Sequence, residues 1–119
     1  MNCVFCSLPS SRHIAENDHF VAVRDIHPVS PGHSLIVARR HITDFFALTE
    51  EEMLSLRELC MKVKELLDNE YQPEGYNLGM NCGRAAGQSI FHFHLHFIPR
   101  YGGDRKGIRG LREYIREIL

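Results

Sequence analysis

The stretch that decides the fold reads Gln88-Ser89-Ile90-Phe91-His92-Phe93-His94-Leu95-His96-Phe97-Ile98-Pro99-Arg100. Its histidines alternate with bulky apolar residues, and a period of two predicts a β-strand. His92, His94 and His96 would then share one face of the strand, with neighbours about 7 Å apart, and the apolar side chains would face a core. A single inward histidine is usually a hydrogen-bonded core residue, but burying three titratable rings together is costly. We therefore expect this face to carry chemistry: metal ligation, nucleophilic attack or proton transfer.

The composition of the 119-residue chain is that of one ordinary globular domain. We expect a single domain over residues 1–119, because this length supports one core and little more. The formal net charge of −1 argues against a nucleic acid polymer as partner, since such binders are usually basic. No apolar run approaches the roughly 18 residues of a membrane span, and the N-terminus lacks the layout of a signal peptide. The expectation is a cytoplasmic protein without disulfides and without a membrane partner.

Further strands are expected before the histidine stretch. His13 to Arg24 reads as two short strands around a polar turn at residues 16–18, the second strand being Phe20 to Arg24. Ser34 to Ala38 is a candidate for a central strand, and Tyr76 to Met80 is expected to be another. Together with the histidine strand, these segments predict a central antiparallel sheet of about five strands.

Two helices complete the expected α+β domain. Thr49 and Glu52 have the spacing of a capping box, so one long helix from Glu50 to Asn69 is expected to begin there. Its charges form a solvated face, and its apolar face is predicted to consist of Met53, Leu56, Cys60, Val63 and Leu67. A short C-terminal helix is expected from apolar residues at helical spacing, Ile108, Leu111, Ile115 and Ile118.

The N-terminus carries a Cys-x-x-Cys pair, Cys3 and Cys6, whose meaning is ambiguous by itself. A thioredoxin-type redox motif lies between a first strand and a helix, whereas this pair lies within six residues of the start with no strand before it. A redox role is therefore the weaker interpretation. Metal ligation needs two further ligands from elsewhere in the chain.

The alternating histidines, preceded by Gln88-Ser89 and followed by Phe97-Ile98, resemble the histidine triad of the HIT superfamily of nucleotide hydrolases and transferases. The resemblance covers roughly Cys3 to Tyr101 and implies a HIT-like fold and a homodimer. It also implies a purine nucleotide substrate. The middle histidine, His94, would attack the α-phosphorus, and water would later release the nucleotidyl-histidine intermediate.

The resemblance assigns further roles position by position. The catalytic group would comprise His94, His96, Ser89, His33 and Asn81. Among these, His96 would donate to a phosphate oxygen, Ser89 would hydrogen-bond near the leaving group, and His33 would buttress the triad. Asp25 would take the ribose hydroxyls. Gln88 is also assigned to nucleotide binding, together with an apolar slot for the base, Val4, Phe5, Leu8, Val23, Ile26 and Leu35.

A HIT subgroup, like the related galactose-1-phosphate uridylyltransferases, is similar in joining an N-terminal Cys-x-x-Cys to two histidines. This similarity implies a structural Zn²⁺ in a closed tetrahedral set, Cys3, Cys6, His41 and His92. His33 is the competing ligand. The segment between Cys6 and His13 is shorter than is usual in the family, which affects the base pocket.

Three functions are compatible with these residues. The first is a nucleotidyl hydrolase acting on purine nucleoside phosphoramidates or dinucleoside polyphosphates. The second is a zinc-bearing nucleotide-binding protein with little turnover. The third is a metalloenzyme in which all three triad histidines bind one ion. Alternation on a flat strand disfavours the third, because ligands spaced by about 7 Å cannot all reach one ion at about 2 Å.

Overall fold

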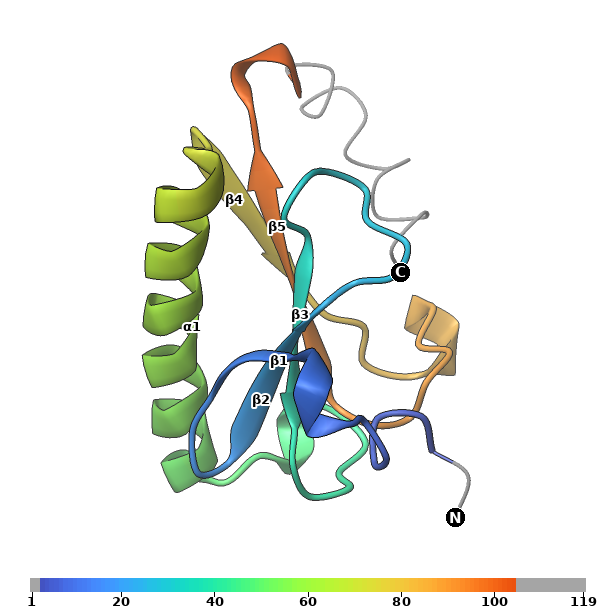
Figure 1. Ribbon diagram of the computed structural model, residues 1–119. Coiled ribbons are helices and arrows are strands. Elements are labelled where there is room, and N and C mark those ends of the chain that lie inside the picture. The colour runs from blue at the N-terminus through green and yellow to red at the C-terminus, as the bar shows by residue number, and fades with distance from the viewer. Residues whose placement is uncertain (1–2, 105–119) are drawn as a thin grey trace.

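Five strands and one long helix make up the part of the chain that the computed structural model describes, residues 3–104 (Figure 1). The strands are β1 (His13–Glu16), β2 (Phe20–Arg24), β3 (Ser34–Ala38), β4 (Gly75–Gly79) and β5 (His94–Arg100), and the helix is α1 (Glu50–Tyr71). Short 3-10 turns lie at Ser10–Arg12, Phe45–Ala47, Arg84–Ala86 and Gly102–Asp104. The predicted α+β architecture is confirmed. The C-terminal helix predicted from residues 108–118 lies outside the described residues.

The strands form one antiparallel sheet with the order β1-β2-β3-β5-β4, so β5 has a neighbour on each side. On the β3 side, Leu35 is paired with His96 and Val37 with His94. On the β4 side, Leu78 is paired with Phe97. Hydrogen-bonded ladders on both edges fix the register of β5, and with it the direction of each side chain.

The alternation in β5 divides the molecule into two sides. Phe93, Leu95 and Phe97 are at most 4% exposed and join buried residues of α1, β2 and β3 in the main core. Figure 1 shows α1 along this side of the sheet, while the N-terminal segment and the 3-10 turn at Arg84–Ala86 lie on the opposite side. That opposite side, called the open face below, carries a smaller apolar cluster, Val21, Val23, Leu35 and Val37.

One part of the sequence prediction is wrong: His92 does not belong to the strand. β5 begins at His94, and His92 lies in the bend before it. The backbone of Phe93 explains this, because its carbonyl accepts from Ala38 N at 3.2 Å while its N–H donates to Ile42 O at 2.7 Å. Since these partners lie on either side of the turn after β3, the regular ladder cannot continue to His92.

Helix α1 begins where predicted and extends two residues beyond the predicted end. Thr49 Oγ1 accepts from Glu52 N, and Glu52 Oε1 accepts from Thr49 N, which completes the capping box. The predicted apolar face is wrong at Met53, which is 37% exposed, whereas Leu59 is fully buried. Leu59 lies three residues after Leu56 and four before Val63, so it falls on the same side of the helix.

Glu52 departs from the predicted solvated face of α1, because its side chain is 5% exposed. Its carboxylate accepts from Arg40 Nε at 2.8 Å and from Arg40 Nη2 at 2.9 Å. These hydrogen bonds, together with those at Thr49, lower the pKa of Glu52 from 4.5 to about 2. The pair therefore connects the start of α1 to the turn that follows β3, the turn that also carries His41.

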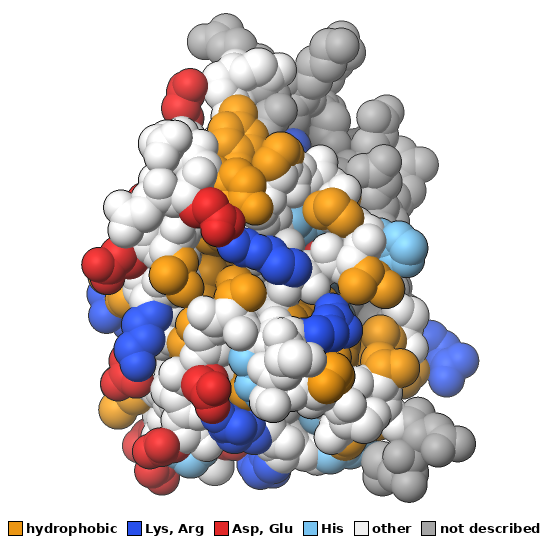
Figure 2. Space-filling view, viewed as in Figure 1, with side chains coloured by type: hydrophobic (Ala, Val, Ile, Leu, Met, Phe, Trp, Pro, Cys, Tyr) orange, Lys and Arg blue, Asp and Glu red, His pale blue; other side chains and the backbone are white. Residues whose placement is uncertain are grey.

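Charges of both signs are interspersed over the surface. Figure 2 shows Lys and Arg side chains next to Asp and Glu side chains across the face in view, without a large region of one sign. Among the described residues, the structure contains no helix with the length and apolarity needed to cross a membrane. The surface thus lacks, on this face, the basic stripe that binding to nucleic acid polymers requires.

We predict that Glu52→Gln lowers the free energy of unfolding at pH 7 by about 1 to 2 kcal/mol, since a charge-assisted hydrogen-bonded pair is lost and solvent screens the half-exposed Arg40. Because the folded-state pKa is lowered, the contribution of Glu52 is complete above pH 4.5 and disappears as the pH falls towards 2. Urea denaturation at pH 7 and pH 3 measures both effects. The matched control is Glu50→Gln, an exposed residue in the same first turn. Equal losses for the two variants at pH 7 would contradict the prediction.

Candidate active site

His94 is held so that one of its ring nitrogens keeps its lone pair. It is the first residue of β5 and is half-buried on the open face. Its Nδ1 lies 2.9 Å from the carbonyl oxygen of His92. A carbonyl can only accept, so Nδ1 carries the proton of the neutral ring and Nε2 carries the lone pair. This is the tautomer that a nucleophilic imidazole needs.

His96 follows on the same face, with its ring centroid 5.3 Å from that of His94. Its protonation is set through His33, which lies just before β3. The backbone N–H of Val29 donates to His33 Nδ1 at 3.1 Å, so the neutral His33 ring carries its proton on Nε2. That Nε2 is 3.0 Å from His96 Nδ1. His96 Nδ1 therefore accepts, and the proton of His96 lies on its own Nε2. His94 thus offers a lone pair and its neighbour His96 a donor.

Burial keeps these rings neutral. It lowers the pKa of His94 and of His33 below the usual 6.5, and it lowers the pKa of His96 to about 4. Repulsion by a charge on His94 or His33 adds to the shift of His96, and the carboxylate of Asp25 opposes it. Neutral rings at neutral pH are what both tautomer assignments require.

Four further side chains meet beside the triad: Cys3, Cys6, His41 and His92. Their ligand atoms all lie within 4.8 Å of one another. Nδ1 of His92 is 3.0 Å from Nδ1 of His41, 3.4 Å from Cys3 Sγ and 3.5 Å from Cys6 Sγ. A tetrahedral zinc with bonds of about 2.0 to 2.3 Å has edges of roughly 3.3 to 3.8 Å, so the donors are close to a ligand shell.

The tautomer of His92 also fits a metal ligand. Its Nε2 lies 2.6 Å from the carbonyl oxygen of Ala38, so Nε2 carries the proton and Nδ1 faces the two cysteines with a lone pair. The three triad histidines do not converge on one point, because His92 faces this cluster while His94 and His96 face other partners. The arrangement does not match the metalloenzyme in which all three bind one ion.

A second set of possible ligands, Asp25, His33 and His96, also lies within 4.8 Å. Its chemistry is different, since His33 presents a proton and not a lone pair to the other two. The hydrogen bond from Val29 N occupies the other nitrogen of His33. A ligating histidine usually donates from its second nitrogen, so this set fits a hydrogen-bonded network better than a metal site. His33 lies in this network, away from the cysteines.

An apolar cluster adjoins His94 on the open face. Phe5 and Leu8 pack against the cluster that contains Val23 and Leu35, and the ring of Phe5 is 4.9 Å from that of His94. The structure thus brings together four of the six residues predicted for the base slot. The other two, Val4 and Ile26, are 60% and 71% exposed and lie outside the cluster.

Sequence reasoning missed three contributors to this site. Val21 and Val37 complete the apolar cluster, and the period of two that they share with Val23 and Leu35 was the available signal. Val29 acts through its backbone N–H, which no side-chain pattern reveals.

The loop that leads into β5 is held by Gln88, which is 4% exposed. Its Oε1 accepts from Gly83 N at 2.8 Å, and its Nε2 donates to Thr43 O at 2.7 Å and to Ile90 O at 3.1 Å. The amide is thus engaged with backbone, which is the arrangement of a loop support. Ser89, the next residue, is exposed, and Asn81 is half-buried at the start of the same loop.

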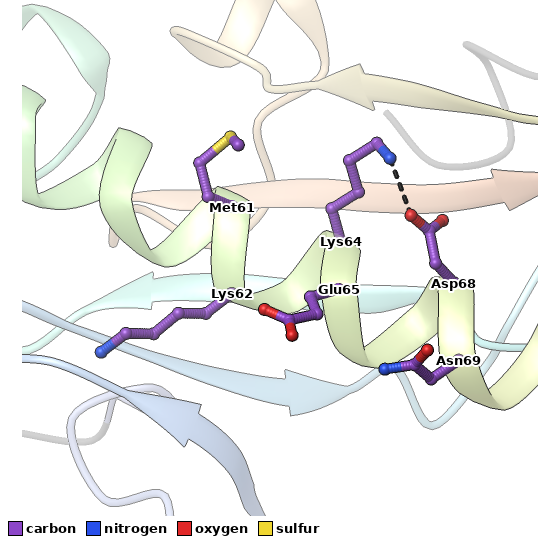
Figure 3. Close-up of a pocket in the computed structure, with 6 residues that line it drawn as sticks. All are labelled: Met61, Lys62, Lys64, Glu65, Asp68 and Asn69. Carbon is purple, nitrogen blue, oxygen red and sulfur yellow. Dashed lines mark hydrogen bonds and ion pairs between the residues drawn. The ribbon is translucent and has the colours of Figure 1, made fainter.

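A hollow on the outer face of α1 does not belong to this site. Figure 3 shows it lined by side chains of one helix segment, with an ion pair of 2.7 Å between Lys64 and Asp68. Helix α1 packs on the side of the sheet that Phe93 and Leu95 face, whereas His94 and His96 lie on the open face. The hollow and the triad are therefore on opposite sides of the sheet.

Comparisons with known proteins agree with this geometry. The HIT domain profile matches residues 9–103. Protein hit of Bacillus subtilis is 38% identical over 112 residues, covering 89% of this chain and 77% of that protein. AP-4-A phosphorylase of Mycobacterium tuberculosis is 35% identical over 92 residues, covering 76% of this chain and 47% of that protein.

Among solved structures, a Zn-bound histidine triad family protein from Mycobacterium smegmatis has a TM-score of 0.76 and 27% identity, covering 98% of this chain and 95% of that one. By its sequence profile, its relatives and its structure, this chain belongs to the HIT domain family.

Proposed function

We propose that the protein is a nucleotidyl hydrolase that cleaves the bond to the α-phosphate in purine nucleoside phosphoramidates or dinucleoside polyphosphates. The observation that carries the proposal is the hydrogen bond from His94 Nδ1 to the His92 carbonyl. It leaves a neutral ring with a free Nε2 lone pair beside an apolar slot. The likeness to AP-4-A phosphorylase supports a nucleotide with a phosphate chain as the substrate class.

The reaction has two displacements at phosphorus. In the first, His94 Nε2 attacks the α-phosphorus, and the bond to the leaving nitrogen or oxygen breaks as the leaving group takes up a proton. In the second, water attacks the phosphorus and gives up a proton, which replaces the one taken by the leaving group, the bond to Nε2 breaks, and a nucleoside monophosphate is released. Splitting one transfer into two steps lowers each barrier. The Nε2 proton of His96 donates to a phosphate oxygen, where negative charge develops in both transition states.

The nucleotide is placed by groups around His94. Asp25 takes the ribose hydroxyls, and the base enters the slot formed by Phe5, Leu8, Val23 and Leu35, which Val4 and Ile26 flank. Ser89 and Asn81 lie on the leaving-group side. Gln88 contributes by holding the loop that carries them, since its amide is bonded to backbone.

A structural zinc fits the cluster of Cys3, Cys6, His41 and His92, and the Zn-bound relative supports this assignment. When bound, the ion supplies cross-linking and no step of the reaction. It joins the N-terminal turn to the bend before β5, where the His92 carbonyl holds the nucleophile. The same turn places Phe5 against His94.

We also propose a homodimer and a cytoplasmic location. β4 is an edge strand of the described sheet, and its Leu78 is 54% exposed, which suits pairing with a second copy. The four cysteines are free thiols in the structure, which suits a reducing compartment. The mixed surface charge supports a small nucleotide, and neither a nucleic acid polymer nor a membrane, as partner.

We predict that His94→Ala lowers kcat by about a thousandfold or more, because the covalent step is lost. The Kd for AMP is expected to change less than about threefold. Steady-state assays with adenosine 5′-phosphoramidate and calorimetric titration with AMP measure the two effects. His19→Ala is the matched control, since His19 lies at the far end of β2 and pairs with Glu51. Near-normal turnover by His94→Ala would refute the covalent mechanism, and an inactive parent that binds AMP would favour the nucleotide-binding protein with little turnover.

We predict one zinc per chain, lost in Cys6→Ser together with a fall in Tm of about 10 °C, because a structural site couples binding to folding. Elemental analysis of protein prepared without chelator and thermal denaturation test this. Cys60→Ala, a change in α1 outside the cluster, is expected to keep the metal. His41→Ala is expected to lose zinc and His33→Ala to keep it, and the opposite result would move the fourth ligand to His33.

We predict that kcat/KM for adenosine 5′-phosphoramidate is at least as high as for diadenosine tetraphosphate. A small amine needs one proton and little space, and the exposed Ser89 hydroxyl can relay it. A polyphosphate leaving group needs cations along its length, for which Arg84 and Arg100 are the nearest by sequence. Assays of both substrates on one preparation decide the matter. A clear preference for the tetraphosphate that is lost in Arg84→Ala or Arg100→Ala, but kept in Lys62→Ala on α1, would reverse the assignment.

A further inference from the structure

A single proton lies between two acceptors at the inner end of the site. It belongs to His33 Nε2, because the N–H of Val29 occupies the other nitrogen of that ring. His96 Nδ1 is 3.0 Å from His33 Nε2, and Asp25 Oδ2 is 3.3 Å from the same atom. Both rings are nearly inaccessible, with His33 1% and His96 7% exposed. Bulk water therefore has little access to the hydrogen bond between the two rings.

One carboxylate oxygen of Asp25 is held by the backbone, and the other faces the two histidines. Its Oδ1 accepts from the backbone N–H of His27 at 2.8 Å, which fixes the carboxylate at the end of β2. Its Oδ2 faces His33 and lies 3.9 Å from His96 Nδ1. The side chain is 15% exposed, so a ligand on the open face can reach it. Asp25 thus stands between the place assigned to the sugar and the pair of histidines.

We propose that Asp25 is a positioning residue as well as a sugar ligand: a ribose hydroxyl that donates to its carboxylate directs the His33 proton to His96 and thereby fixes the donor tautomer of His96. This inference rests on the proposed function, in which Asp25 takes the ribose hydroxyls. The sugar then contributes to the chemical step and not only to binding. No bond to phosphorus is formed or broken: the His33 N–H changes its acceptor, and the equilibrium between the two tautomers of His96 moves towards the one with its proton on Nε2.

The direction of the effect follows from competition for one donor. Without ligand, the charged carboxylate draws the His33 proton partly away from His96, because hydrogen bonds to charged acceptors are the stronger ones. When a ribose hydroxyl donates a hydrogen bond to Asp25, the carboxylate becomes a weaker acceptor for the His33 N–H. His96 Nδ1 is then the better of the two acceptors. With Nδ1 engaged, His96 keeps its proton on Nε2, where it can donate to a phosphate oxygen. Binding energy from a remote group is in this way used to orient a group at the reacting centre.

The first test compares adenosine 5′-phosphoramidate with its 2′,3′-dideoxy analogue. In the parent protein, removal of the hydroxyls is expected to lower kcat about tenfold in addition to raising KM. In Asp25→Asn, the ratio of the two kcat values is expected to fall to about 1, since the charged competitor is gone. The matched control is Asp18→Asn, an exposed residue at the opposite end of β2, which is expected to keep the parental ratio. A higher KM with unchanged kcat in the parent would overturn the inference.

The second test needs binding alone, so it separates this inference from the proposed function. Nitrogen NMR of the histidine rings is recorded with AMP and with 2′,3′-dideoxy-AMP. AMP is expected to shift the His96 signals towards a hydrogen-bonded, unprotonated Nδ1 and a protonated Nε2, and the dideoxy ligand is expected to leave them near their free values. Identical spectra for the two bound ligands would overturn the inference, even in an active enzyme. The expected difference in a protein without turnover would uphold it while the proposed function fails.

Discussion

The geometry of the candidate site depends on His92, one buried residue that makes three different interactions. Its Nε2 donates to the Ala38 carbonyl, its Nδ1 faces the two cysteines and His41, and its own carbonyl accepts from His94. The first interaction selects the tautomer that the second one needs. The third fixes the tautomer of His94. A disturbance of the cluster of Cys3, Cys6, His41 and His92 would thus reach His94 through the bend that contains His92.

Much of the fold could be read from the sequence because the apolar periodicity is strong. The alternation from Phe93 to Phe97 predicted which side chains enter the core, and the capping box at Thr49 predicted where α1 begins. The errors lie where tertiary contacts decide. His92 follows the same alternation, yet the pairing of Phe93 with Ala38 and Ile42 removes it from the strand. In the sequence, Glu52 cannot be told from the exposed charges of α1, but in the structure its carboxylate pairs with Arg40.

The candidate site, like the fold, could be predicted from the sequence only in part. The alternation pointed to the triad histidines, whereas the family resemblance pointed to the zinc ligands and to Asp25. The structure brings Cys3, Cys6, His41 and His92 into one cluster and Asp25, His33 and His96 into another. Their protonation could not be predicted, because it is decided by backbone groups. Val29 N–H, Ala38 C=O and His92 C=O set the tautomers of three rings. Backbone groups are present at every residue, so no pattern in the sequence marks the ones that matter.

Because the ring tautomers depend on particular backbone partners, the proposed function constrains the register of β5 more strictly than the burial of its apolar side chains does. A slip of β5 along β3 by two residues would keep Leu95 and Phe97 on the core side, since the side-chain period is two. It would move each histidine ring by about 7 Å, away from the backbone group that sets its proton. His96 would then lose its place opposite Leu35 and its contact with His33. The alternation of apolar side chains alone therefore does not select the functional register. Pairing on both edges of β5 and the anchoring of His92 at the end of β3 supply the remaining specificity.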